Sequence, residues 1–152
     1  MSPTFQLPPQ AAARIRAFYD HWDRLRGGRE CPSRGDFDPA AVPEFLEYIS
    51  LVDVSPETPR FVYRLVGTGV VRLLGKELTG QPVGTGVKAS EIDKVLERYQ
   101  TVAETMVPLY HRDYLQEENN DFTEVERLML PLSEDDQTVN MILVFIWPRP
   151  AR

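Results

Sequence analysis

Few side chains of this 152-residue chain have both the type and the spacing that chemistry requires. Residues 84–89 (GTGVKA) fit the pattern G-x-G-x-x-A, in which a glycine turn and a helix N-terminus hold the pyrophosphate of a dinucleotide. A true turn of this kind follows a buried strand directly, whereas Gln81, Pro82 and Val83 do not form a strand pattern. We therefore expect a glycine-containing loop here and no dinucleotide site.

Arg64 places a charge in an apolar row of a predicted strand, between Val62 and Val66. A buried guanidinium needs a carboxylate partner, because an unpaired buried charge is too costly. Asp53, at the end of the preceding strand, is a candidate partner in an ion pair that fixes the strand pair to the helical layer, which is the interpretation we favour. The functional alternative is that Arg64 anchors an anionic or carbonyl ligand.

A histidine and a group of charges mark the strands predicted near the C-terminus. His111 could ligate a haem iron, but a surface or interface histidine fits a lone strand position better. We expect cross-strand charge pairs on a solvent-facing sheet surface among Arg112, Asp113, Glu124, Glu126 and Arg127. No nucleophile is placed to complete an acid–base site with these carboxylates.

Cys31 is the sole cysteine of the chain. An internal disulfide is therefore excluded, and no cluster with metal-ligand spacing predicts a zinc site. A cysteine motif for covalent flavin attachment is also absent, because Cys31 precedes the predicted sheet.

The hydrophobic pattern predicts the elements that position these residues. Helical spacing runs over 11–25 and stops at Gly27-Gly28, and Asp38 followed by Pro39 predicts a short helix to about residue 46. A strand pair is expected at 48–54 and 61–66, and Thr68 is expected to cap a short helix that Gly75 closes. A long helix begins with a capping box at Ser90 and ends at Pro108, and three strands follow at about 109–116, 122–132 and 138–147.

Two strands, a helical middle and three further strands predict an α+β architecture, a five-stranded antiparallel sheet with helices on one face. The last strand is apolar on both sides, so it is expected to be central and covered on both faces. The N-terminal helix is the natural second layer, packed either on its own sheet or on that of a partner chain. Its apolar stripe carries Ile15, Phe18, Tyr19 and Trp22.

Composition argues against two classes of partner. A net charge of −6 disfavours the phosphate backbone of nucleic acids, which requires a basic face. The longest apolar run, residues 141–147, is far shorter than the roughly 20 residues of a membrane span, and the N-terminus lacks a secretory signal pattern. We therefore expect a cytoplasmic protein without nucleic-acid or membrane partners.

The order of the elements is similar to that of the PAS fold, and three motifs make the resemblance more specific. Asp36-Phe37-Asp38-Pro39, Tyr63-Arg64-Leu65-Val66-Gly67-Thr68 and Leu78-Thr79-Gly80 resemble a bacterial family of small, often stand-alone PAS-like proteins. The resemblance implies a leader and cap helix over 1–28, a PAS-like domain over 29–147 and a tail over 148–152. It also implies a sensory or protein-interaction role, with an N-terminal cap of the kind that often mediates dimerisation.

These observations predict a non-catalytic regulatory module that binds a small ligand or a regulatory protein and responds through helix packing or dimer geometry. The residues expected to line the ligand cavity are Tyr63, Arg64, Thr68, Val71, Leu74, Leu78, Tyr99 and Met141. A homodimer interface is expected at Ile15, Phe18, Tyr19 and Trp22, and the sequence does not identify a cofactor. Two alternatives stay open: a structural homodimer with a filled core, and a small cone-shaped α+β enzyme with Asp113 or His111 as base.

Overall fold

The computed structural model describes residues 5–116 and 122–149. Its strands are β1 (Ile49–Val54), β2 (Phe61–Val66), β3 (Leu109–Gln116), β4 (Phe122–Leu132) and β5 (Met141–Pro148). Its α-helices are α1 (Ala13–Arg26), α2 (Thr68–Leu74) and α3 (Ala89–Thr105), and three short 3-10 helices lie at Arg34–Asp36, Pro39–Ala41 and Leu46–Tyr48. The last three residues of the predicted tail, 150–152, lie outside the described residues.

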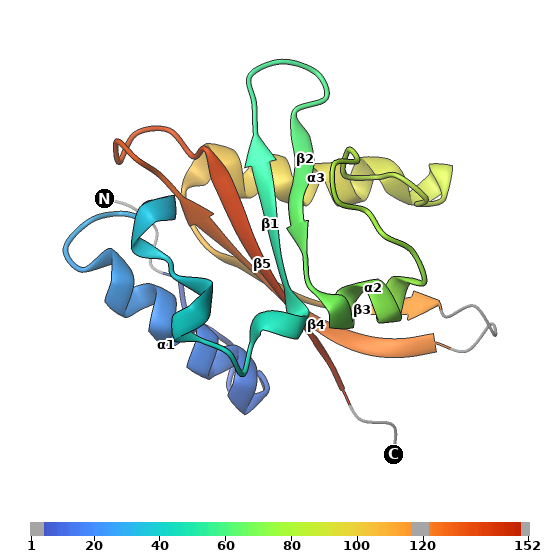
Figure 1. Ribbon diagram of the computed structural model, residues 1–152, viewed down its shortest axis with the longest axis horizontal. Coiled ribbons are helices and arrows are strands. Elements are labelled where there is room, and N and C mark those ends of the chain that lie inside the picture. The colour runs from blue at the N-terminus through green and yellow to red at the C-terminus, as the bar shows by residue number, and fades with distance from the viewer. Residues whose placement is uncertain (1–4, 117–121, 150–152) are drawn as a thin grey trace.

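The five strands form one antiparallel sheet in the order β2-β1-β5-β4-β3 (Figure 1). β5 is therefore central, as its two apolar faces predict, and every residue from Met141 to Ile146 is buried. The predicted α+β architecture with a five-stranded antiparallel sheet is confirmed.

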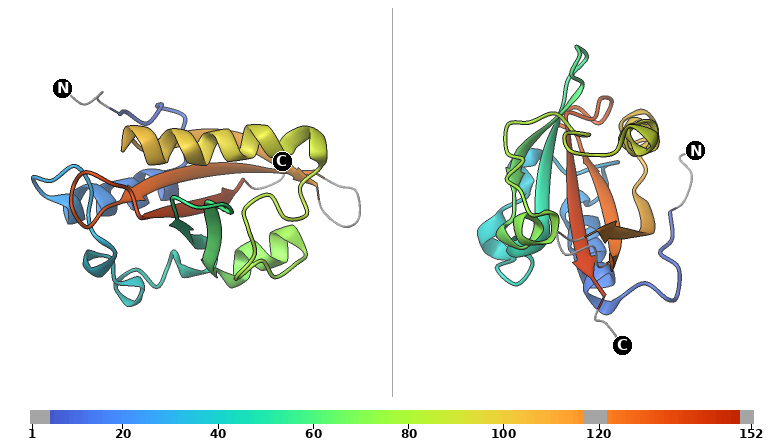
Figure 2. Two further views of the ribbon diagram at one scale, coloured as in Figure 1. Left: turned by 90° about the horizontal axis from the view of Figure 1, so that it is seen from above. Right: turned by 90° about the vertical axis from the view of Figure 1, so that its right-hand side faces the viewer.

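The two faces of the sheet are covered by different helices of the same chain. α1 covers the face that we call the α1 face, where Phe18 is fully buried and its ring centroid lies 4.9 Å from that of Phe145. α2 and α3 cover the opposite face, which we call the α3 face, and α3 runs along the length of the sheet (Figure 2). Along β5 the side chains alternate between these faces, so Met141, Leu143 and Phe145 belong to the α1 face.

Glycine and proline set several element boundaries. α1 ends where Gly27 takes a positive φ of 59°, a conformation that glycine adopts without strain. Asp38 does accept a hydrogen bond from the N–H of Ala40, at 3.0 Å, but this helix stops after one turn. The prediction of a helix to residue 46 is wrong because Pro43 has no N–H to continue the ladder.

The predicted caps of the other two helices are also wrong. α3 begins at Ala89, and no side chain caps it, so Ser90 lies inside the helix and forms no capping box. The cap position of α2 is Gly67, and Thr68 is already the first helical residue.

A buried carboxylate fixes the N-terminal end of α1 to the sheet. Glu126 of β4 is 0% exposed, and its Oε1 accepts hydrogen bonds from the Ala12 N–H at 2.8 Å and from the Tyr110 hydroxyl at 2.6 Å. No side chain of the local sequence caps α1, so Glu126 supplies an acceptor where the helix dipole favours negative charge. The burial and the neighbouring carboxylate together raise the pKa of Tyr110.

The expectation of a solvent-facing charge surface is therefore only partly correct. Arg112 and Glu124 do form an ion pair across β3 and β4, at 2.8 Å, on side chains that are about one third exposed. Glu126 instead lies beneath α1. Among the described residues, no helix is long and apolar enough to cross a membrane.

The contrast between Glu126 and Glu124 gives a test of how α1 is held. Glu126→Ala leaves two partly buried donors without an acceptor, and we expect it to lower the free energy of unfolding by about 2–4 kcal/mol. Glu124→Ala removes only partly exposed ion pairs, and we expect a loss of no more than about 1 kcal/mol. Urea denaturation measures both, and equal small losses would contradict the account.

Candidate functional site

The α3 face is not completely filled by side chains. A cavity of about 430 Å³ lies between the sheet, α2, α3 and the segment that joins the two helices. Most of its wall is apolar or aromatic, and its exposed members, among them Tyr114, Phe122, Thr85 and Gly86, place its opening at the surface. The apolar and aromatic lining comprises Tyr63, Val70, Leu74, Leu78, Val87, Val95, Tyr99, Tyr114, Leu115, Phe122, Val144 and Ile146.

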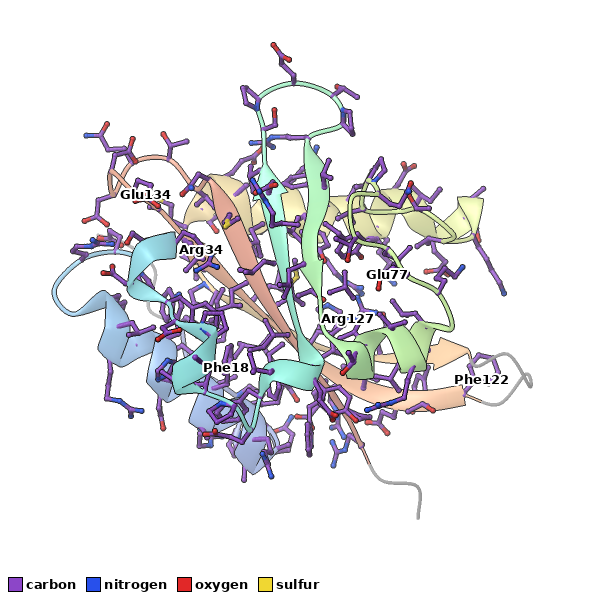
Figure 3. All side chains as sticks on the ribbon, in the orientation of Figure 1. Phe18, Arg34, Glu77, Phe122, Arg127 and Glu134 are labelled. Carbon is purple, nitrogen blue, oxygen red and sulfur yellow. The ribbon has the colours of Figure 1, made fainter. Side chains whose placement is uncertain are left out.

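Two polar side chains of the sheet each present to this cavity a buried polar atom that has no partner among the described residues. Arg127 of β4 follows the alternation Val125, Arg127, Met129, which places it on the α3 face, and Figure 3 shows it near the centre of the molecule. Its Nε–H is buried and donates no hydrogen bond to any described residue. Ser50 of β1 is 2% exposed, and its Oγ is likewise without a partner among these residues. Both groups are available to a bound molecule.

Two tyrosines line the same cavity as Arg127. The hydroxyl groups of Tyr63 and Tyr99 influence the titration of one another, and Arg127 acts electrostatically on both. Burial raises the pKa of Tyr63, and it raises that of Tyr99 still further, although the positive charge of Arg127 opposes both shifts. The two phenols are therefore neutral donors at physiological pH.

His111 lies opposite Arg127 on the neighbouring strand β3. Burial, with the positive charges of Arg98 and Arg127, lowers the pKa of His111 to about 3, against the opposing charge of Asp113. Its Nδ1 has no hydrogen-bond partner among the described residues. The imidazole is therefore neutral and a weak base, and it does not have the surface environment that the sequence suggested.

Lys76, Lys88 and Arg127 outnumber the two acidic residues of the lining, Glu91 and Asp113. Asp113 forms an ion pair with Arg98 of α3 at 3.4 Å, and Glu91 is exposed in the first turn of that helix. Lys76 and Lys88 are exposed, and neither they nor Arg127 take part in an ion pair within the described part of the chain. A protein of net charge −6 thus has a cavity in which positive charge is the less compensated.

Four of the eight residues predicted for the cavity lie on it. These are Tyr63, Leu74, Leu78 and Tyr99. Thr68 is exposed at the first position of α2, and Val71 of the same helix is turned away from the cavity that Val70 and Leu74 line. Val70 and Leu74, four residues apart on α2, face the cavity. The sequence alone did not show which side of this helix faces inward.

Arg64 and Met141 lie elsewhere, each for a structural reason. The register between β1 and β2 shifts between Leu51 and Val52, where Leu51 faces Leu65 and Val52 faces Tyr63, so Arg64 has no opposite residue. This bulge turns Arg64 outward, where its Nε lies 2.9 Å from Asp53 Oδ2 with a side chain 63% exposed. Met141 packs on the α1 face. The predicted ion pair with Asp53 is present, but it joins β1 to β2 on exposed side chains and not at a buried position against the helical layer. Placing Arg64 and Met141 on the cavity was wrong.

The residues predicted for a homodimer interface are covered within one chain. Ile15, Phe18 and Trp22 are buried on the α1 face, and the indole N–H of Trp22 donates to the Pro131 carbonyl at 3.0 Å. Tyr19 is half-buried and packs against the same cluster. The helix stripe is therefore used for the chain's own core, and a homodimer stays a prediction.

The glycine motif lies on the cavity without the setting of a dinucleotide turn. Residues 80–83 follow the edge of β2 through hydrogen bonds to Tyr63 and Phe61 and an isolated antiparallel bridge to Val62. Thr85, Gly86, Val87 and Lys88 then line the cavity before α3 begins. The expected loop is confirmed. No group of three or more potential metal ligands occurs in the described ranges.

The principal residue that the sequence analysis misplaced is Arg127. It was assigned to a wet surface with Glu124 and Glu126, although Val125 and Met129 on either side form the kind of apolar row that singled out Arg64. The same criterion, applied to β4, predicts a buried guanidinium at this position.

The burial of His111 predicts a pH dependence of stability. The unfolded chain binds a proton on this histidine near pH 6.5, whereas the folded chain does so only near pH 3, so stability is complete above pH 6.5 and falls as the pH is lowered toward 3. We expect about 1–2 kcal/mol of the loss between pH 7 and 5 to disappear in His111→Gln. Urea denaturation at the two pH values measures it, with His21→Gln as the comparison. A larger effect from His21 would contradict this prediction.

Several solved structures are similar to this chain in fold. The LOV protein of Rhodobacter sphaeroides aligns with a TM-score of 0.54 at 12% identity, covering 74% of this chain and 68% of that one. The LOV domain of an Erythrobacter litoralis blue-light activated histidine kinase aligns at 0.53 and 12%, covering 68% and 96%. The Drosophila melanogaster Cycle PAS-B domain with bound glycerol aligns at 0.51 and 8%, covering 67% and 99%. At these identities the similarity concerns the fold alone.

The sole cysteine of the chain lies away from the cavity. Cys31 is buried in the cluster of the α1 face, and burial raises the pKa of its thiol to about 12. The cavity lining contains no thiol. A comparison with curated protein sequences gave no match. The family model described as PAS domain matches residues 11–146, most of the sequence, and this chain therefore belongs to the PAS domain family.

Proposed function

We propose that this PAS domain is a sensory module that takes up a small molecule in the cavity of the α3 face and reports its presence through the packing of α1. The observation that carries the proposal is a cavity of about 430 Å³ whose sheet wall contains buried polar atoms of Arg127 and Ser50 that no described residue satisfies. Native interiors seldom leave such atoms unsatisfied, so their grouping on one cavity favours a polar ligand. PAS domains are generally sensory modules without catalytic activity.

β4 provides the physical connection between the cavity and α1. Arg127 and Glu126 are consecutive residues, so their side chains point to opposite faces of the sheet. Glu126 accepts from Ala12 at the start of α1, while Arg127 lines the cavity. A ligand that binds one arrangement of β4 more tightly than another would shift the population of docked α1 by that difference in affinity.

A homodimer is the second element of the proposal. The stripe of α1 is covered within the chain, so a dimer would use other surfaces. Phe122, 65% exposed, and Tyr114, 64% exposed, are the largest exposed aromatic side chains among the described residues, and both stand at the opening of the cavity. Deleting residues 1–28 would expose the core beneath α1, so such a variant could not report the oligomeric state of the intact fold. Sedimentation equilibrium of the full chain therefore measures whether the protein is a dimer. A cytoplasmic location also stays a prediction.

Ligand uptake is tested by thermal unfolding against a broad metabolite library. A ligand at 100 times its dissociation constant stabilises the folded state by about 2.7 kcal/mol, which raises the melting temperature by several degrees. Val95→Phe fills part of the cavity and should abolish this response, whereas Val71→Phe lies outside the lining and should retain it.

The role of α1 is tested on the same samples by hydrogen exchange. We expect a ligand to change the protection of amides in the first turn of α1, among them that of Arg16, which bonds the Ala12 carbonyl. A library without any stabilising compound would overturn the uptake of a ligand. Stabilisation with unchanged exchange in α1 would overturn the reporting step only.

A further inference from the structure

Arg127 is the feature of the cavity that the fold leaves least compensated. Its buried Nε–H has no acceptor among the described residues, and the residue directly opposite on β3 is the neutral His111. The two acidic residues of the lining do not neutralise this guanidinium. Asp113 is paired with Arg98, and Glu91 is exposed at the start of α3. A half-buried guanidinium in this position favours an anion from outside the chain.

The other lining residues indicate which further chemical groups a fitting ligand would carry. Tyr63 and Tyr99 supply phenolic hydroxyls to the same cavity as Arg127, and Lys76 and Lys88 add positive charge at exposed positions. Apart from these groups, the wall consists mainly of aliphatic and aromatic side chains. One planar guanidinium beside two hydroxyl donors matches a single carboxylate, which accepts a two-pronged bond from arginine. The apolar wall matches a hydrophobic body.

We propose that the ligand of this cavity is a small organic monocarboxylate with an apolar body, whose carboxylate binds Arg127 beside the hydroxyls of Tyr63 and Tyr99. This inference rests on the proposed uptake of a ligand and specifies its chemical class. The cavity volume of about 430 Å³ lies within the range of sites for small organic molecules. Lys76 and Lys88 attract the anion toward the opening and so increase its rate of entry.

The test compares matched pairs of acids and their primary amides, which have nearly the same shape and differ in charge. Alkyl and aryl members with six to twelve carbon atoms are titrated by calorimetry into the full chain. We expect the acids to bind at least about tenfold more tightly than their amides, since a charge-assisted bond is replaced by a neutral one. Amides that bind as tightly as their acids would overturn the proposal.

Substitutions at two arginines locate the charge that is responsible. Arg127→Gln should remove the preference for acids over amides, and Arg127→Lys should retain part of it because the charge remains without the planar fork. Arg64→Gln is the matched control: it is exposed on β2, pairs with Asp53 and lies off the cavity, so it should leave the preference unchanged. An unchanged preference in Arg127→Gln would contradict the assignment.

The stability of the ligand-free variants gives a readout that a purely structural role of Arg127 would not produce. Removing an uncompensated charge should leave the denaturation midpoint of Arg127→Gln equal to or above that of the original chain. A large decrease would indicate that Arg127 holds the fold together, contrary to this inference. Binding of neutral or cationic library compounds without binding of acids would overturn the ligand class while leaving the sensory proposal intact. Absence of binding by every compound would overturn both.

Discussion

The whole structure depends on a sheet that is apolar on both faces. β5 lies at its centre, with Phe145 directed to one side and Val144 to the other, and neither side can be left in water. α1 closes one face by packing Phe18 on Phe145. α2, α3 and the segment between them cover the other face less completely, and the cavity is the space that remains. The candidate site is thus a consequence of unequal covering of the two faces.

Strand β4 directs one charged side chain to each of the two covered faces. Glu126 points beneath α1, where the Ala12 N–H and the Tyr110 hydroxyl satisfy one carboxylate oxygen. Arg127, the next residue, points into the cavity, where no described carboxylate satisfies it. These opposite charges on opposite faces connect the start of α1 and the wall of the cavity to one strand. A displacement of β4 therefore changes both the contact with α1 and the wall of the cavity.

Much of the fold follows from local patterns in the sequence. The apolar alternation of β5 predicts its central place, and Gly27 marks the end of α1. Only half of the candidate site is predicted, because the face to which a strand side chain points depends on features that the alternation of apolar and polar residues does not reveal. A bulge at Arg64 turns outward the arginine that looked buried. In β5 both faces are apolar, so nothing local assigns Met141 to the side of α1. The position of Arg127 on the cavity face could have been predicted, because its neighbours on that face of β4, Val125 and Met129, are apolar.

The central claim is that the cavity of this PAS domain receives an organic anion at Arg127. An NMR titration of the full chain, labelled with ¹⁵N, follows the Nε–H resonances of the arginines and the backbone amides together while a carboxylic acid is added. The account predicts that the Arg127 Nε–H resonance shifts with saturation, together with the amides of the cavity lining, while that of Arg64 stays in place. Shifts confined to surface residues away from the cavity, with Arg127 unchanged, would contradict it.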